Sequence, residues 1–225
     1  MRILERLPQE TNRSYALRTI TENIVALDLP PGSQIREKDI SVQMGMSRTP
    51  VREALLELAR VRIVRILPQR NSTVALIDYA LVEEACFMRS VLECAVVELD
   101  CELADPKGLR QLEDNIKLQH FYLDTHNFQM LMELDDQFHA ILFGIAQKAQ
   151  IYEMTRNMLV HFDRVHRMAQ DSIQNIKIVE DHAQILEAIR NRDAEWAKQT
   201  MRMHLSRYKY DAKAIFNDHP ELFLK

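Results

Sequence analysis

The scarcity of proline and glycine constrains this chain more than any other feature. Only four glycines and seven prolines occur among 225 residues, and no proline lies between Pro106 and Pro220. A β-sandwich or barrel needs a turn residue about every 8–12 positions. The sequence therefore predicts a mainly α fold built from long helices.

Composition excludes several classes of protein. The chain is 47% hydrophobic and 28% charged, which is typical of a globular protein and not of a disordered one. No apolar run approaches the ~18–20 residues of a membrane span, and Met1–Glu10 is too charged for a secretory signal. The three cysteines, Cys86, Cys94 and Cys101, are odd in number and spaced as on a helix, which argues against a disulfide framework. We expect a cytoplasmic, reducing location and no membrane partner.

Charge is divided unevenly along the chain. Residues 1–77 carry 12 Lys and Arg against 8 Asp and Glu, whereas residues 78–225 carry 17 against 25. A basic N-terminal part joined to an acidic remainder indicates a module that binds a polyanion, attached to a second domain.

The N-terminal part has the pattern of a winged helix-turn-helix. Apolar residues at helical spacing predict a helix from Ser14 to Leu27, which the Pro30-Pro31-Gly32 sequence ends. A short helix over 37–44 and a third helix capped by Ser47 follow. Two β-rich runs, 63–67 and 73–77, then predict a small β-hairpin wing. We expect this DNA-binding domain to cover residues 13–77.

The start of the third helix is the candidate DNA-reading surface. If Val51 and Leu55 pack inward, Arg48, Thr49 and Arg52 face solvent at the end that meets base edges in a major groove. An arginine fork binds guanine or a phosphate, and the helix N-terminus at Ser47 also favours a phosphate. A solvated basic face on a small helical domain is the alternative that spacing alone leaves open. Two further arginines are candidates for contacts to the DNA backbone and to the minor groove, Arg36 and Arg70 respectively.

Two segments carry a resemblance to a known family. The stretch from Leu29 through Pro-Pro-Gly-Ser-Gln-Ile-Arg-Glu and the stretch Ser-Arg-Thr-Pro-Val-Arg-Glu-Ala-Leu from Ser47 closely resemble the DNA-binding domain of GntR-family bacterial transcription regulators. The resemblance implies contacts to a double-stranded DNA operator. The residues that it implicates are Arg36, Arg48, Thr49 and Arg52, with Gln69, Arg70 and Asn71 of the wing.

From Tyr79 onward the pattern is almost entirely helical. Short loops between the predicted helices favour an antiparallel bundle of about six helices over residues 78–217. The helices that we expect cover 79–104, 106–125, 127–147, 150–170, 175–191 and 193–216.

Three of these helices place histidine on an apolar face. Asp135 and His139 lie four residues apart on one stripe, while His182 and His204 lie on the apolar stripes of two later helices. Each histidine alone is most often a core residue bonded to backbone or water. One cation, however, satisfies all four buried groups together. One carboxylate and three imidazoles suit a divalent transition metal such as Zn, Ni or Mn.

Arg89 lies on the inward stripe of the first predicted bundle helix. Because a guanidinium does not shed its charge by deprotonation, an inward arginine requires an anion. That anion is either an internal carboxylate or the carboxylate of a bound ligand. Arg164 is a further candidate for ligand binding.

The bundle also resembles a known domain. The segments that begin at Arg89, Asp135, His182 and Met201 resemble the FCD ligand-binding domain that accompanies the FadR branch of GntR regulators, in its shorter, VanR-like form. The resemblance implies a small organic acid as effector. The metal ligands that it implies are Asp135, His139, His182 and His204, and it extends to Arg89 for the effector.

Together these features predict a metabolite-responsive transcriptional regulator that is not an enzyme. We expect a repressor that binds a palindromic operator as a homodimer, since two half-sites about one helical turn apart multiply the few contacts of one small domain. The alternative is a metal-dependent hydrolase that uses the Asp/His3 site to activate water. No nucleophile motif supports this alternative.

Overall fold

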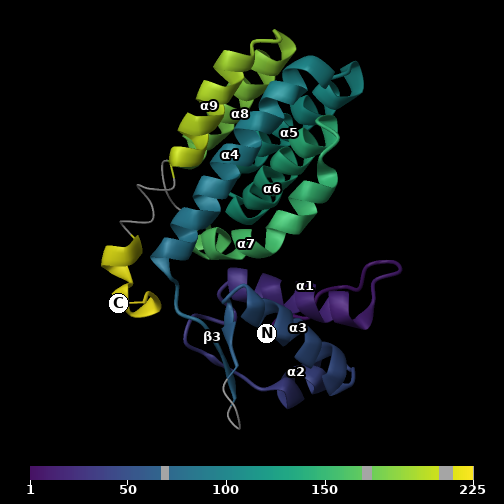
Figure 1. The fold of residues 1–225 in the computed structure, drawn as a ribbon, viewed down its shortest axis with the longest axis vertical. Helices are drawn as coiled ribbons and strands as arrows, with labels where there is room; N and C mark the ends of the chain where they lie inside the picture. Colours follow the sequence, from purple (N-terminus) through teal and green to yellow (C-terminus); the bar gives the residue numbers. More distant parts are fainter. Residues whose placement is uncertain (67–70, 169–173, 208–214, 225) are drawn as a thin grey trace. The chain divides into compact units, whose positions relative to one another are not determined.

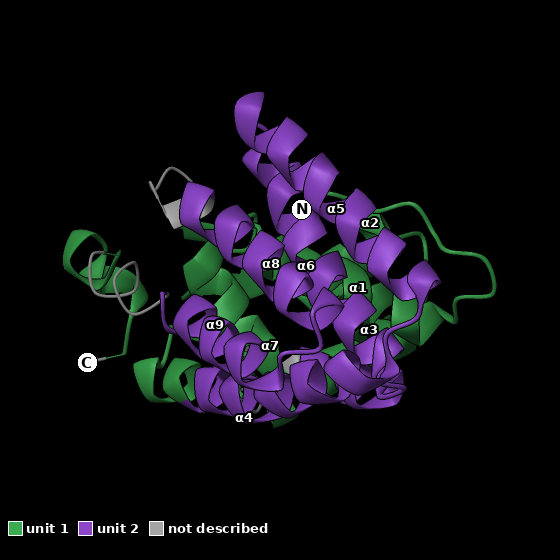
Figure 2. Cartoon of the chain, turned by 90° about the horizontal axis from the view of Figure 1, so that it is seen from above, with its two compact units in different colours: residues 1–83, 157–168, 214–225 green, residues 84–156, 169–213 purple. Residues whose placement is uncertain are grey.

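The computed structural model describes residues 1–66, 71–168, 174–207 and 215–224, and this part of the chain is mainly helical (Figure 1). The chain forms two compact units, which Figure 2 colours separately. Unit 1 contains residues 1–83, 157–168 and 214–225, and unit 2 contains residues 84–156 and 169–213.

The described helices other than α9 agree closely with the predicted spans. In the DNA-binding part they are α1 (Asn12–Val25), α2 (Glu37–Gln43) and α3 (Arg48–Arg60). The later helices are α4 (Tyr79–Leu103), α5 (Pro106–Asp124), α6 (Phe128–Ile145), α7 (Ala149–Met168), α8 (Gln174–Arg190) and α9 (Ala194–Ser206). The predicted mainly α fold with a small wing is confirmed.

The sheet has one strand more than the predicted hairpin. Strands β2 (Val64–Arg65) and β3 (Ser72–Val74) are shorter than predicted, and β1 (Gln34–Ile35) pairs antiparallel with the other edge of β3. Strand β1 was not predictable from the sequence, because two residues are too few to show a strand period. The end of the predicted first strand and most of the predicted turn, residues 67–70, lie outside the described residues.

The core of unit 1 lies between α1 and α3. Ile20 and Ile24 of α1 and Leu55 and Leu58 of α3 are completely buried there. Val160 of α7 belongs to the same apolar cluster. The second half of α7 is therefore part of the unit that carries the winged helix-turn-helix.

The C-terminal end of the chain also belongs to unit 1. Phe223 is buried and pairs with Ile77, whose N–H donates to Leu222 O at 2.8 Å and whose carbonyl accepts from Leu224 N at 2.8 Å. The predicted final helix over 193–216 is too long, because α9 ends at Ser206. Residues 208–214 lie outside the described part.

Unit 2 is a bundle in which α5 contacts α6 and α8, and α8 contacts α9. Short polar side chains cap two of its helices, with Asp105 accepting from Gly108 N at 2.7 Å and Asp193 accepting from Trp196 N at 3.0 Å. A Cβ at Gly108 would come within 2.8 Å of Ile145, so glycine permits the close approach of α5 and α6. None of the described helices is long and apolar enough to cross a membrane.

One buried charge in unit 2 has an unusual environment. Asp100 of α4 is completely buried, and neither carboxylate oxygen has a hydrogen-bond partner among the residues that the structure describes. Burial raises the pKa of Asp100 to about 8. Since the carboxyl of the unfolded chain ionises near pH 4, folding requires Asp100 to hold its proton through neutral pH.

We therefore expect Asp100→Asn to stabilise the protein in a pH-dependent way. The wild-type protein loses stability as the pH rises from about 4 to about 8, because its unfolded form releases a proton that its folded form retains. An asparagine at this position has no proton to release, so the stability of the variant relative to wild type should increase between pH 5 and pH 8, by at most about 4 kcal/mol at about 1.4 kcal/mol per pH unit. Urea unfolding at both pH values measures the difference. The exposed Asp124→Asn serves as control, and an equal effect at both pH values would contradict the explanation.

Candidate DNA-reading surface and metal centre

Helix α3 presents the predicted polar residues to solvent. Arg48, Thr49 and Arg52 are exposed, while Val51 and Leu55 are completely buried. The 3.6-residue helical period separates these two sets onto opposite faces. The first two turns of α3 thus offer two guanidinium groups on a surface that its own core does not cover.

Ser47 occupies the N-cap position of α3 but forms no capping hydrogen bond. The sequence therefore predicts the start of α3 correctly, but the predicted capping by the Ser47 side chain does not occur. The first turn of α3 also contains no acidic residue. The positive end of the helix dipole is consequently not neutralised by its own chain, which suits a phosphate.

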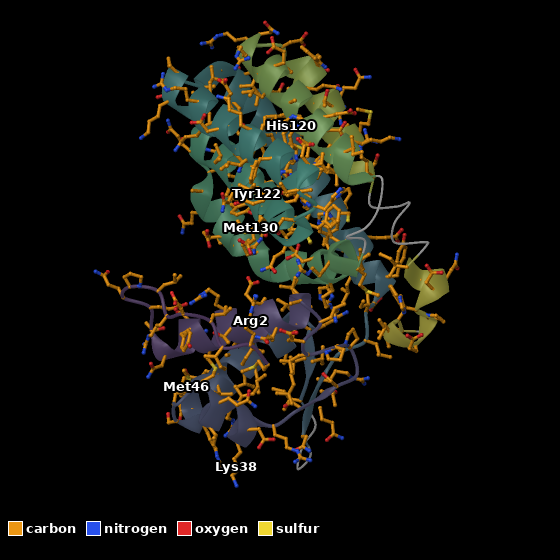
Figure 3. The ribbon with its side chains drawn as sticks, turned by 180° about the vertical axis from the view of Figure 1, so that it is seen from behind. Arg2, Lys38, Met46, His120, Tyr122 and Met130 are labelled. Carbon is orange, nitrogen blue, oxygen red and sulfur yellow. The ribbon has the colours of Figure 1, made fainter. Side chains whose placement is uncertain are left out.

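The other candidates for DNA contacts lie on α2 and on the wing. Arg36 is the exposed N-cap residue of α2, and Lys38 projects away from the same helix (Figure 3). Asn71 is exposed and donates from Nδ2 to Gln34 Oε1 at 3.2 Å, which links the end of the wing to β1. Gln69 and Arg70 lie outside the described residues.

The structure brings the four predicted metal ligands together. Asp135 and His139 extend from α6, His182 from α8 and His204 from α9, and one ligand atom of each lies within 4.8 Å of the others. His182 Nε2 is 3.4 Å from Asp135 Oδ1, and His204 Nε2 is 3.3 Å from His139 Nε2. All four residues are buried, with exposed fractions from 0% to 7%.

A second set of polar side chains surrounds this cluster. His139 Nδ1 is 2.6 Å from Glu93 Oε2, and His182 Nδ1 is 2.8 Å from Gln119 Oε1. His204 Nδ1 is 3.7 Å from Asp181 Oδ2. Each imidazole thus has an oxygen near its Nδ1 atom, although only the contact of His182 with Gln119 has the geometry of a hydrogen bond. An outer oxygen at Nδ1 is the usual arrangement around histidines that bind a metal through Nε2.

This arrangement fits a cation. When Nδ1–H points toward an outer oxygen, the Nε2 lone pair points inward, toward the other two rings and the Asp135 carboxylate. His182 Nε2 makes no hydrogen bond within the described residues although it is completely buried. In a tetrahedral site with ligand atoms 2.0–2.1 Å from zinc, these atoms lie about 3.4 Å apart, so an ion would draw the most distant ones together by about 1.4 Å.

Burial also favours the state of the rings that binds a metal. Loss of water, followed by the nearby charge of His204, lowers the pKa of His182 well below its usual value. Loss of water likewise lowers the pKa of His204. Because only a neutral imidazole has a lone pair to donate, these shifts reduce the competition between protons and a metal at neutral pH.

Arg89 is buried and donates from Nε to Glu93 Oε1 at 2.7 Å. The structure thus supplies the internal carboxylate that the sequence left as one of two possibilities. Burial by itself would raise the pKa of Glu93, but its contacts with Arg89 and His139 outweigh burial and lower that pKa to about 2. Glu93 therefore connects Arg89 to the candidate metal centre.

Sequence reasoning missed three residues of the outer set. Glu93 lies four positions after Arg89, a spacing that would have indicated an ion pair. Asp181 precedes His182 directly and binds Arg207, whose Nε and Nη2 lie at 2.5 and 2.8 Å from its oxygens. Gln119 carries no such clue, because its position opposite α8 depends on how α5 packs.

Arg164 does not lie in the bundle, contrary to its interpretation as a candidate for ligand binding. It is completely buried in unit 1, where its Nη1 donates to Ala75 O at 2.8 Å. The position of Arg164 was not predictable from the sequence, because an apolar stripe on α7 does not indicate which unit the helix packs against.

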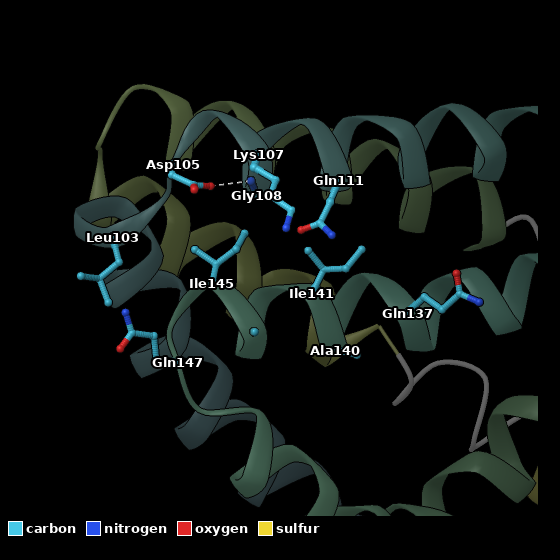
Figure 4. A pocket seen from close by; sticks show the side chains of 11 residues that line it. Leu103, Asp105, Lys107, Gly108, Gln111, Gln137, Ala140, Ile141, Ile145 and Gln147 are labelled. Carbon is cyan, nitrogen blue, oxygen red and sulfur yellow. Dashed lines mark hydrogen bonds between the residues drawn. The ribbon is translucent and has the colours of Figure 1, made fainter. Parts of the chain in front are cut away.

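A groove of about 570 Å³ lies between α5 and α6 (Figure 4). Lys107, Gln111 and Gln137 line it together with Ile141 and Ile145. None of the four candidate ligands lines this groove, so it is separate from the candidate metal centre.

Comparisons with known proteins identify both parts of the chain. Residues 14–74 match the model of bacterial regulatory proteins of the gntR family, and residues 84–207 match that of the FCD domain. The chain belongs to the GntR family. The predicted resemblances to the GntR and FCD domains are thus confirmed.

Relatives of this GntR protein are regulators. It is 30% identical to the HTH-type transcriptional repressor RspR of Escherichia coli K12 over 96% of this chain and 95% of RspR. It is 32% identical to an HTH-type transcriptional regulator of Streptomyces ambofaciens over 95% of this chain and 90% of that protein. McbR of E. coli has the same fold, with a TM-score of 0.81, 20% identity and coverage of 93% and 100%.

We expect Arg48→Ala and Arg52→Ala in this GntR protein to lose about 1–3 kcal/mol each of sequence-specific DNA affinity. Arg36→Ala should instead weaken binding to every sequence and flatten its salt dependence, since a phosphate contact carries no sequence information. Fluorescence anisotropy measures affinity for a duplex that the wild type selects from a random library and for a scrambled duplex. The control is Arg110→Ala, a change at an exposed position of α5. Full selectivity in both α3 variants would contradict the assignment of α3 as the DNA-reading helix.

Proposed function

We propose that this GntR-family regulator represses transcription and that a small organic acid controls it through a metal bound by Asp135, His139, His182 and His204. The observation that carries the proposal is the meeting of these four buried side chains, from three helices, in the FCD part of a chain that also bears an exposed recognition helix. The FCD domain of a regulator is the part suited to sense a signal, because the GntR part is the one that reads DNA.

The donor set supports a divalent transition metal, of which Zn, Ni and Mn are the candidates. Imidazole nitrogens suit all three ions, and one carboxylate with three imidazoles leaves coordination positions open. When bound, such an ion supplies a Lewis-acid position at which a carboxylate oxygen can replace water. The protein's own contribution is to hold the rings in place through Glu93, Gln119 and Asp181.

Arg89 is the side chain proposed to assist effector binding. It lies beside the centre, since its charge contributes to the lowered pKa values of His182 and His204. Its contact with Glu93 fixes the guanidinium from one side. A carboxylate effector would place a second anion near this cation.

Dimerisation and the type of operator follow from the DNA-binding problem. A single winged helix-turn-helix makes few base contacts, so a homodimer on a palindromic operator gains affinity from two half-sites. The similarity to RspR, which is named as a repressor, supports repression. In this proposal the effector weakens operator binding, because it favours a bundle arrangement that spaces the two recognition helices differently.

In this proposal the DNA-binding domain covers residues 13–77 and the effector-binding domain covers residues 78–217. The protein is placed in the FadR branch of the family, in its shorter, VanR-like form. Because transcription takes place on chromosomal DNA, the proposed location of the protein is the bacterial cytoplasm. The hydrolase alternative receives no support, since the reported relatives are all regulators.

One experiment tests the metal and the effector together. We expect purified wild-type protein to bind about one Zn, Ni or Mn ion per chain, and His182→Ala to bind the same ion much more weakly, because one of the four ligands is lost. Elemental analysis measures the metal, and anisotropy with the selected duplex measures DNA binding in a panel of small carboxylic acids. The acid that weakens DNA binding by wild type should not affect His182→Ala or EDTA-treated protein.

The exposed His120→Ala is the matched control and should behave as wild type (Figure 3 labels His120). If the purified protein binds no metal after incubation with each ion, the proposed metal site is refuted. An acid response that persists in His182→Ala would refute the link between metal and effector. If the metal raises the melting temperature and no acid alters DNA binding, the metal has a structural role only and the proposed effector site is refuted.

A further inference from the structure

The second half of α7 contains two buried polar residues that the proposed sensing site does not use. Arg164 is completely buried, and His161 is 4% exposed. Both lie in the segment 157–168, which belongs to unit 1 together with the winged helix-turn-helix (Figure 2). They are separate in unit and in contacts from the candidate metal ligands.

These two side chains contact the two ends of the wing. His161 Nε2 is 2.6 Å from the carbonyl oxygen of Val61, the residue that caps the C-terminus of the recognition helix α3. Arg164 Nη1 donates to the carbonyl oxygen of Ala75 at 2.8 Å, directly after β3. Ala75 N in turn donates to Ile63 O at 2.9 Å, so the two held segments are also bonded to each other.

The two side chains are bonded to one another as well. Arg164 Nη2 lies 3.3 Å from His161 Nδ1. Because His161 donates from Nε2 to the Val61 carbonyl, its Nδ1 atom has the lone pair that accepts from the guanidinium. Burial lowers the pKa of His161 to about 4, which keeps the ring in this neutral form. The hydrogen bonds therefore run in one direction, from Arg164 through His161 to α3.

An arginine is a costly choice for this position. No carboxylate lies within ion-pair distance of Arg164 among the residues described, and its Nε atom has no hydrogen-bond partner there. A buried apolar side chain of similar size is often more stable than a buried charge. An apolar residue, however, could not bind the Ala75 carbonyl and His161 together, so the contacts and not the burial explain the arginine.

We infer that His161 and Arg164 are positioning residues for DNA reading, which fix the wing relative to the recognition helix. Only Val61, Arg62 and Ile63 separate α3 from β2, so the carbonyl of Val61 sets where the wing begins. The carbonyl of Ala75 sets where the wing ends. A wing and a recognition helix read one site only when their spacing matches that of the two grooves.

The test uses the full-length protein and two duplexes. We expect Arg164→Met to weaken binding to the selected duplex by about tenfold, the size of one specific contact, while the affinity for a scrambled duplex stays within about twofold. Phosphate attraction depends on exposed charges, which this variant retains. Arg164→Lys, which reaches one carbonyl without forming the fork, should lie between Arg164→Met and wild type. Arg110→Met, the same change on the exposed face of α5, should have no effect.

The ratio of the two affinities separates positioning from loss of fold. A merely structural role would reduce the folded fraction and lower both affinities by the same factor, and that result would overturn the inference. Unchanged affinity for the selected duplex in folded Arg164→Met would also overturn it.

If circular dichroism shows that Arg164→Met does not fold, a second pair of variants decides. His161→Gln keeps one donor and one acceptor and should retain selectivity, whereas His161→Leu should lose it. Equal selectivity in these two variants would refute the positioning role.

Discussion

Each ionisable side chain that this fold buries needs an opposite charge, a bound proton or polar partners in fixed positions, and this constraint organises both units. The core of unit 2 contains the carboxylates of Glu93, Asp135 and Asp181 around three imidazoles. Arg89 and Arg207 pair with two of these carboxylates. With the imidazoles neutral, the group carries one net negative charge. A divalent cation would reverse it to one net positive charge, which suits a carboxylate ligand.

The sequence could predict the members of this centre within one helix but not all of their neighbours. Asp135 and His139 follow from helical spacing, and the need of each buried histidine for a partner brought His182 and His204 into the same set. Gln119 was not predictable, because an uncharged amide on a helix looks like any half-exposed polar residue until α5 is packed against α8. Arg89 and Glu93 show an intermediate case, since the spacing indicated an anion without choosing between an internal and a bound one.

The same distinction applies to the fold. Helix bounds follow from apolar periodicity and from the scarcity of proline, so α4 to α8 were predictable to within a few residues. Strand β1 and the pairing of Phe223 with Ile77 involve one or two residues each, and they are formed by contacts far apart in the sequence. The assignment of the second half of α7 to unit 1 was equally out of reach. Its apolar stripe would look identical if it packed against the bundle.

Asp100 and Arg164 show how two isolated buried charges meet the constraint in different ways. The carboxyl group of Asp100 can become neutral by binding a proton, so it needs no partner, and its raised pKa of about 8 reflects this. Burial lowers the pKa of Arg164 only to about 10, so the guanidinium remains charged at neutral pH. It therefore depends on oxygen and nitrogen acceptors in fixed positions. The acceptors that it finds are the Ala75 carbonyl and the His161 ring, so the buried charge is stabilised only when the base of the wing is in place.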